Sequence, residues 1–155
     1  MDVSDAQEAL RWAQGKRTLI QAIGEWSALG ARVSVRMSGG TLVGFIAEWG
    51  EDWVCLTTSS KHIYIPEREI EFAEAEIGSS RPGRYRDQTW IGCIRSLNTS
   101  GGRVGIALRS GQLLYGIIAV VAKDHIRLIQ QEGDDGALGP IVPVVAISCL
   151  WQQIA

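Results

Sequence analysis

Cysteine and histidine are the residues of this chain whose types most directly suggest catalysis or metal binding, and their spacing supports neither. Cys55, Cys93 and Cys149 form no C-x-x-C pair, and each lies among apolar residues, as reduced core thiols do. His62 and His125 have no cysteine or carboxylate at ligand spacing. No serine, cysteine or paired carboxylate stands in a recognisable nucleophile or acid–base pattern. We therefore expect a protein that is not an enzyme and that uses no metal and no cofactor.

Aromatic and basic residues offer a second chemistry, the stacking of bases and the binding of phosphates. Trp49 and Trp53 lie four residues apart across a G-E-D turn, and an aromatic face stacks on a base with about 1–3 kcal/mol. The same spacing suits a cross-turn aromatic pair that closes a hairpin, and we favour this structural interpretation. Arginines gather beside an aromatic residue in the segment 81–86, the combination typical of nucleic-acid contacts.

Net charge decides between RNA and protein as the partner of these residues. The candidate contact residues are Trp49, Trp53, Arg36, Arg81, Arg84, Tyr85, Arg86 and Arg109. The chain has 15 Lys and Arg against 17 Asp and Glu, a net charge of −2. A protein without a basic surface lacks the counterion release that supplies most nonspecific affinity for nucleic acids. We therefore predict a protein partner or a second copy of the chain, and keep RNA binding as the alternative.

The elements that must position these residues come in two copies. Residues 17–37 match 88–108 at a shift of 71, and the shift becomes 72 after the extra residue Arg109. A longer loop then changes the shift to 77, which aligns Pro143 with Pro66. A match that stays in phase through two insertions, both at turns, indicates an internal duplication.

Each copy has the pattern of one helix followed by five short strands. The apolar spacing in 19–26 and 90–97 predicts amphipathic helices, and the alternation in VSVRM and VGIAL predicts half-buried strands. Gly44 and Gly116 lie inside the second strand of each copy and predict a bend there. Short, strongly bent strands allow a small sheet to close on itself.

The motifs of both copies resemble the Sm-like family, which includes the bacterial Hfq proteins. The matching segments are VSVRMSGGTLVGFI and VGIALRSGQLLYGII, with YIPEREI and IVPVVAI closing the copies. The resemblance implies a mainly β protein of two tandem five-stranded bent barrels, each preceded by a helix. It also implies association through edge strands, the fourth of one barrel against the fifth of the next. The polar residues with which the family reads RNA bases are missing here. The two-unit layout is also similar to that of a group of actinobacterial proteins.

The expected organisation follows from these patterns. It comprises an N-terminal helix at 1–16, a first Sm-like unit at 17–73, an exposed linker at 74–87 and a second unit at 88–155. The N-terminus has acids where a secretory signal has basic residues, and the longest apolar stretch, GIIAVVA, is far shorter than the roughly 18 residues of a membrane span. We therefore expect a cytoplasmic, non-catalytic binding or assembly module, a protein-interaction scaffold without membrane contact.

Overall fold

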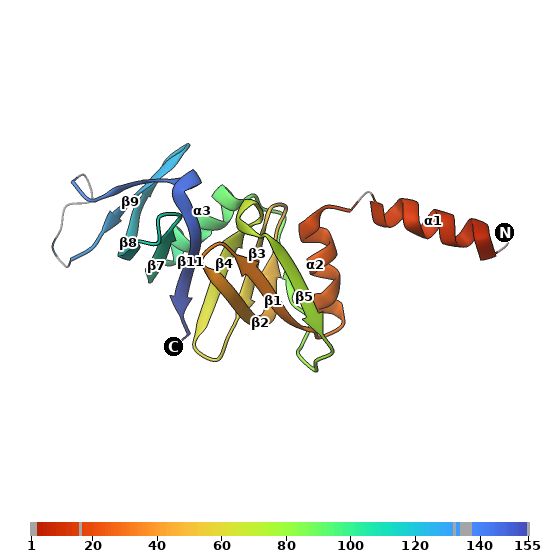
Figure 1. The fold of residues 1–155 in the computed structure, drawn as a ribbon. Helices are drawn as coiled ribbons and strands as arrows, with labels where there is room; N and C mark the ends of the chain where they lie inside the picture. The colour runs from red at the N-terminus through yellow and green to blue at the C-terminus, as the bar shows by residue number, and fades with distance from the viewer. Residues whose placement is uncertain (1–2, 16, 132, 134–137, 155) are drawn as a thin grey trace.

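The computed structural model describes residues 3–15, 17–131, 133 and 138–154. The helices are α1 (Val3–Gly15), α2 (Leu19–Ala28) and α3 (Trp90–Ser100). The first half contains β1 (Arg32–Met37), β2 (Gly40–Trp49), β3 (Trp53–Thr57), β4 (Lys61–Pro66), the 3-10 helix η1 (Glu67–Glu69) and β5 (Phe72–Glu76). A short strand, β6 (Arg84–Tyr85), connects to the second half. That half contains β7 (Arg103–Leu108), β8 (Leu113–Val121), β9 (His125–Ile129), β10 (Ile141–Pro143), η2 (Val144–Ala146) and β11 (Ile147–Gln153). Figure 1 shows α1 extending away from the sheet at the N-terminal end.

All the strands belong to one open sheet, so the prediction of two tandem closed barrels is wrong. The order is β10-β9-β8-β7-β11-β4-β3-β2-β1-β5, with β6 beside β2. The two halves join through the antiparallel pair β4–β11, which sets Leu150 opposite Tyr64 and Gln153 opposite Lys61. An edge strand of a small sheet exposes unpaired N–H and C=O groups. Here β4 and β11 satisfy those groups by pairing with each other across the two halves, and each half stays open.

The two halves keep the same internal strand order and the same irregularities. The orders are β5-β1-β2-β3-β4 and β11-β7-β8-β9-β10. A β-bulge begins two residues after Gly44 in the first half and two residues after Gly116 in the second. A Cβ atom on Gly44 would lie 2.6 Å from the Thr57 oxygen, and one on Gly116 would lie 2.5 Å from the Ile129 oxygen. Glycine therefore permits the same close backbone approach in both halves.

Strand β3 is buried on both faces because each face contributes to a different core. Val54 and Leu56 pack with α2 and β1 in the core of the first half. Trp53 and Cys55 pack with α3 and the strands of the second half. Conversely, Trp151 of β11, in the second half, packs against the core of the first half. A strand covered on both faces has a continuous apolar sequence, which explains WVCL without alternation.

The segment 74–87, predicted to be an exposed linker, is mostly exposed and also contributes the end of β5 and the short strand β6 to the sheet. Its first residues complete β5, and β6 pairs in parallel with β2, placing Arg84 opposite Glu48. Between these strands the Gly83 N–H donates to Ser27 Oγ at 2.6 Å. Backbone hydrogen bonds thus hold the connection against the first half, while the side chains of Arg81 and Arg84 remain exposed.

None of the helices in the described part of the chain is both long enough and apolar enough to cross a membrane.

Candidate binding groove

Two of the predicted contact residues, Trp49 and Tyr85, meet although they lie far apart in the sequence. Trp49 ends β2 and Tyr85 ends β6, and the parallel pairing of these strands places the two residues opposite each other. Their ring centroids are 6.1 Å apart and their planes are inclined by 56°. The Arg86 N–H donates to the Trp49 oxygen at 2.8 Å and fixes this register. The result is an aromatic pair at the end of two hydrogen-bonded strands.

Helix α2 forms the opposite wall of a groove of about 610 Å³ beside this pair. The groove is lined by Thr18, Gln21, Gly24, Glu25, Ala28, Trp49, Gly50, Glu51 and Tyr85. A Cβ atom on Gly24 would lie 2.5 Å from Trp49 Nε1, so the indole lies directly against the helix backbone. Trp49 is therefore held between α2 and Tyr85.

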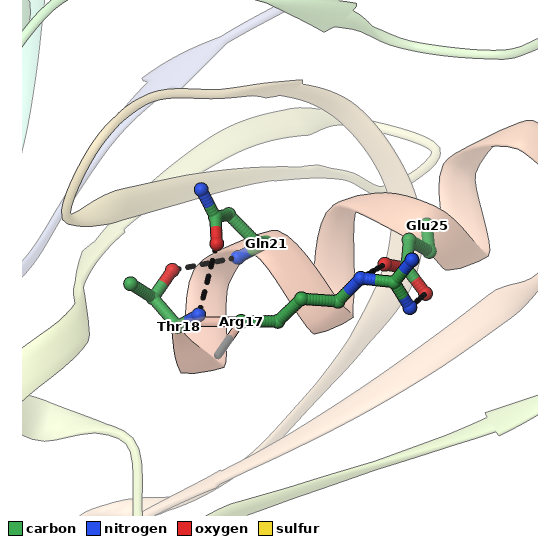
Figure 2. Close-up of polar contacts among 4 residues, drawn as sticks. All are labelled: Arg17, Thr18, Gln21 and Glu25. Atoms are coloured by element: carbon green, nitrogen blue, oxygen red, sulfur yellow. Dashed lines mark hydrogen bonds and ion pairs between the residues drawn. The ribbon is translucent and has the colours of Figure 1, made fainter. Parts of the chain in front are cut away.

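The first turn of α2 is fixed by a capping box. Thr18 Oγ1 accepts a hydrogen bond from the Gln21 N–H at 3.1 Å, and Gln21 Oε1 accepts one from the Thr18 N–H at 2.9 Å (Figure 2). Such reciprocal bonds satisfy two of the N–H groups that a helix start leaves without partners. The wall of the groove formed by α2 therefore begins at a defined residue.

A guanidinium group of the chain already binds one carboxylate of the groove. Arg17 Nε lies 2.8 Å from Glu25 Oε1, and Arg17 Nη1 donates to Glu25 Oε2 at 3.1 Å. Figure 2 shows the Arg17 side chain running along α2 to meet Glu25 end to end. Both oxygens of Glu25 are thus used in a two-pronged contact, the geometry in which carboxylates bind arginine most specifically.

The ionisable groups that line the groove are acidic. Glu25 and Glu51 belong to its lining, and the lining residues named above include no lysine or arginine. Glu48, next to Trp49 in the sequence, pairs with Arg86 at 3.7 Å. An aromatic surface beside carboxylates attracts cations and repels phosphate groups.

Trp53 is not available for stacking, and its predicted cross-turn pair with Trp49 does not form. Trp53 is 0% exposed, and its Nε1 donates to the Gln88 oxygen at 3.0 Å. Its ring lies 6.2 Å from that of Tyr64, whereas Trp49 meets Tyr85. The register explains the difference, because β2 pairs Trp49 with Val54.

The predicted contact arginines occupy several elements, and some are bound within the protein. Arg109 Nε lies 2.6 Å from Glu69 Oε1, and Arg86 pairs with Glu48. Arg36, on β1, donates to Thr41 Oγ1 at 3.3 Å. Arg81 and Arg84 extend from the exposed side of the connection between the halves.

Sequence reasoning missed the contribution of α2 to the groove. Neither Gly24 nor Glu25 belonged to the predicted contact residues, yet both line the cavity. One signal was present, since a glycine in a helix interior is unfavourable by about 1 kcal/mol relative to alanine and usually marks a close approach. At Gly24 that approach is the indole of Trp49.

The cysteines are free and protected by burial. Burial raises the pKa of the Cys149 thiol to about 11, and it raises the pKa of Cys55 and of Cys93 still further. A thiol with a raised pKa is a poor nucleophile at neutral pH. Among the described residues, no group of three or more His, Cys, Asp or Glu side chains is arranged to hold a metal ion.

The sequence matches no model of a known protein family and no curated protein.

Proposed function

We propose that this chain is a non-catalytic module that binds another protein through the groove between α2 and the Trp49–Tyr85 pair. The observation that carries the proposal is an aromatic pair beside a concave surface, with Tyr85 51% exposed. Tryptophan and tyrosine are enriched where proteins bind each other, because they bury a large area with few rotatable bonds. The lining residues also include no cysteine or histidine that would suggest a reaction.

RNA binding is the weaker alternative on electrostatic grounds. The groove is lined by Glu25 and Glu51, and two of the candidate arginines, Arg86 and Arg109, pair with carboxylates of the chain. Nonspecific affinity for RNA depends on basic groups that can replace counterions along the phosphates. The proposal therefore assigns the groove to a protein ligand.

Site-specific photo-crosslinking tests this assignment against RNA. A benzophenone amino acid replaces Tyr85 in one variant and Tyr115 in another, in cells that produce the protein. Tyr115 is the matched control because its exposed fraction, 55%, is similar to the 51% of Tyr85, and because it lies in the second half. We expect an adduct from position 85 that protease removes and nuclease does not, that yields one reproducible protein by mass spectrometry, and that Trp49→Leu abolishes. The proposal is overturned if position 85 gives no adduct, one that nuclease removes, or the same adduct as position 115.

Self-association through the ends of the sheet is a second candidate function. The two end strands, β5 and β10, are the counterparts of β11 and β4, which already pair with each other. The same pairing between two copies would place Ile141 of one copy opposite Ala73 of the next, and Ile141 is exposed. Contacts of this head-to-tail kind build rings or filaments.

The end strands are poorer partners than β4 and β11. Pro140 precedes the three residues of β10, and Glu74 and Glu76 lie on β5. Proline and charged residues on edge strands weaken pairing with other chains. Light scattering over a dilution series tests the candidate: we expect a rise above the monomer mass of 16.9 kDa only at high concentration, reversed by Ile141→Lys. A constant monomer mass would remove it.

We also propose a relationship to the Sm-like family and a cytoplasmic location. The relationship is supported by the pairing of β4 with β11, the fourth and fifth strands of the two copies, since that family associates through these strands. The location is supported by the free thiols of Cys55, Cys93 and Cys149, since disulfides are rare in the cytosol. Oligomer size and cell fractionation test these two statements separately.

A further inference from the structure

We propose that the ligand of the groove is an arginine side chain of the partner protein, whose guanidinium group lies against Trp49 and Tyr85 and binds the groove's carboxylates. This inference rests on the proposed function and narrows it to one chemical class. Its basis is the combination of an aromatic pair with Glu25 and Glu51 in the lining of the same groove.

The aromatic pair and the carboxylates each favour a cation. The face of an indole or phenol ring carries negative potential and attracts a cation held within about 6 Å of its centre. A carboxylate adds a charge-assisted hydrogen bond. Tyr85 is half exposed, Glu51 is exposed and both line the groove, so each is accessible to a side chain arriving from solvent.

The chain itself contains both of the contacts that the proposal requires. Arg17 binds Glu25 through two nitrogen atoms at the rim of the groove. Where β4 of the first half pairs with β11 of the second, Lys61 Nζ lies 5.3 Å from the centre of the Trp151 ring, and Tyr115 packs edge-on against that ring at 5.9 Å. A tryptophan packed against a tyrosine therefore already receives a cation elsewhere in this fold.

Arginine suits the groove better than lysine does. The guanidinium group is planar, so it stacks on an aromatic ring while its edge binds a carboxylate, and it is less strongly hydrated than an ammonium group. Arg17 demonstrates the edge contact at Glu25. The side chains of the Arg17–Glu25 ion pair are both about half exposed, and ion pairs of this kind contribute little free energy. An incoming guanidinium group can therefore displace Arg17 from Glu25.

The indole N–H signal of Trp49 in a ¹⁵N–¹H spectrum reports on the groove directly, once Trp49→Phe has identified it. The titrant is the peptide acetyl-Gly-Ser-Arg-Ser-Gly-amide, and the key comparison is the same peptide with citrulline, which keeps the shape of arginine and lacks its charge. We expect a saturable shift with the arginine peptide, and roughly tenfold or more weaker binding with citrulline, because both cation–π attraction and the charge-assisted bond are lost. The lysine peptide should bind with intermediate strength.

Variants locate the binding. Tyr85→Ala and Glu51→Gln should each weaken binding several-fold, whereas Arg17→Gln should strengthen it because it releases Glu25. Tyr115→Ala is the matched control and should change nothing. An unchanged spectrum at millimolar arginine peptide, equal binding of the citrulline peptide, or no effect of Tyr85→Ala would each overturn the inference.

These experiments distinguish failure of the arginine assignment from failure of the protein-binding function. If the arginine peptide does not bind while a protein adduct still forms at position 85, the arginine assignment is wrong and the protein-binding function stands. If the adduct is also absent, both are wrong.

Discussion

Asp52 Oδ1 accepts a hydrogen bond from the backbone N–H of Trp90 at 2.7 Å, and this contact ties the β2–β3 turn of the first half to the first turn of α3. Beside it the Glu51 N–H donates to the Gln88 oxygen at 3.0 Å. We predict that Asp52→Ala lowers the free energy of unfolding by about 1–2 kcal/mol, because a helix-start N–H loses its acceptor. Urea denaturation followed by circular dichroism measures the loss.

The second half offers a control for this prediction. Asp124 occupies the equivalent turn position, but its side chain is 85% exposed and contacts His125 at 2.7 Å. Asp124→Ala should therefore change the free energy of unfolding by less than about 0.5 kcal/mol. Equal losses in the two variants would show that the contact with Trp90 contributes nothing of its own.

The close backbone approaches in the second strand of each half predict matched effects. Gly44→Ala and Gly116→Ala each force a methyl group against a carbonyl oxygen, at 2.6 Å and 2.5 Å. Overpacking of this kind costs about 1–3 kcal/mol, and we expect similar losses at both sites. Gly39→Ala is the control, since a Cβ atom there meets nothing within 4 Å. Thermal denaturation of the three variants should separate the first two from the third.

Arg68 of η1 also joins the two halves, through hydrogen bonds to η2 and β11. Its Nη2 donates to the Val144 oxygen at 2.7 Å and to the Ile147 oxygen at 2.9 Å, and burial lowers its pKa. Arg68→Met keeps the aliphatic stem but removes both hydrogen bonds, and we expect a loss of about 1–3 kcal/mol. Arg36→Met, at an exposed position of β1, should be close to neutral in the same denaturation assay. A neutral Arg68→Met would contradict the assignment.

The buried thiols predict a loss of stability at alkaline pH. Burial raises the pKa of Cys149 from 9.0 to about 11, so between these values the thiol ionises in the unfolded chain and stays protonated in the folded one. The stabilising contribution is complete below pH 9 and is lost as pH rises towards 11. The urea midpoint of the wild type should fall over this range, and that of Cys149→Ala should fall less. Parallel curves would contradict the prediction.

Local patterns predicted the repeating elements well because their causes are local. Apolar spacing predicted the helices at 19–26 and 90–97, and Gly44 and Gly116 mark positions where a side chain has no room. Hydrophobic alternation also located the strands around Val33. Spacing and steric exclusion act within a few residues, so the sequence alone reveals them.

Strand pairing and the groove depended on contacts that the sequence does not specify. Alternation of apolar and polar residues is compatible with several pairing partners for one strand. The sequence KHIYIP of β4 therefore did not indicate whether this strand pairs with β11 or closes a barrel within the first half. The groove depends on β6, two residues long, in a segment rich in glycine, serine and arginine that has the composition of a loop. Without β6, Tyr85 could not be placed beside Trp49.

Burial of β3 from both sides makes the two copies inseparable. If the chain were cut between them, Trp53 and Cys55 on the isolated first copy would lose the covering of α3, and Trp90 and Ile94 would lose the surface beneath them. Calorimetry should therefore record a single melting transition with matching calorimetric and van't Hoff enthalpies. Removing either half would expose buried residues of the other.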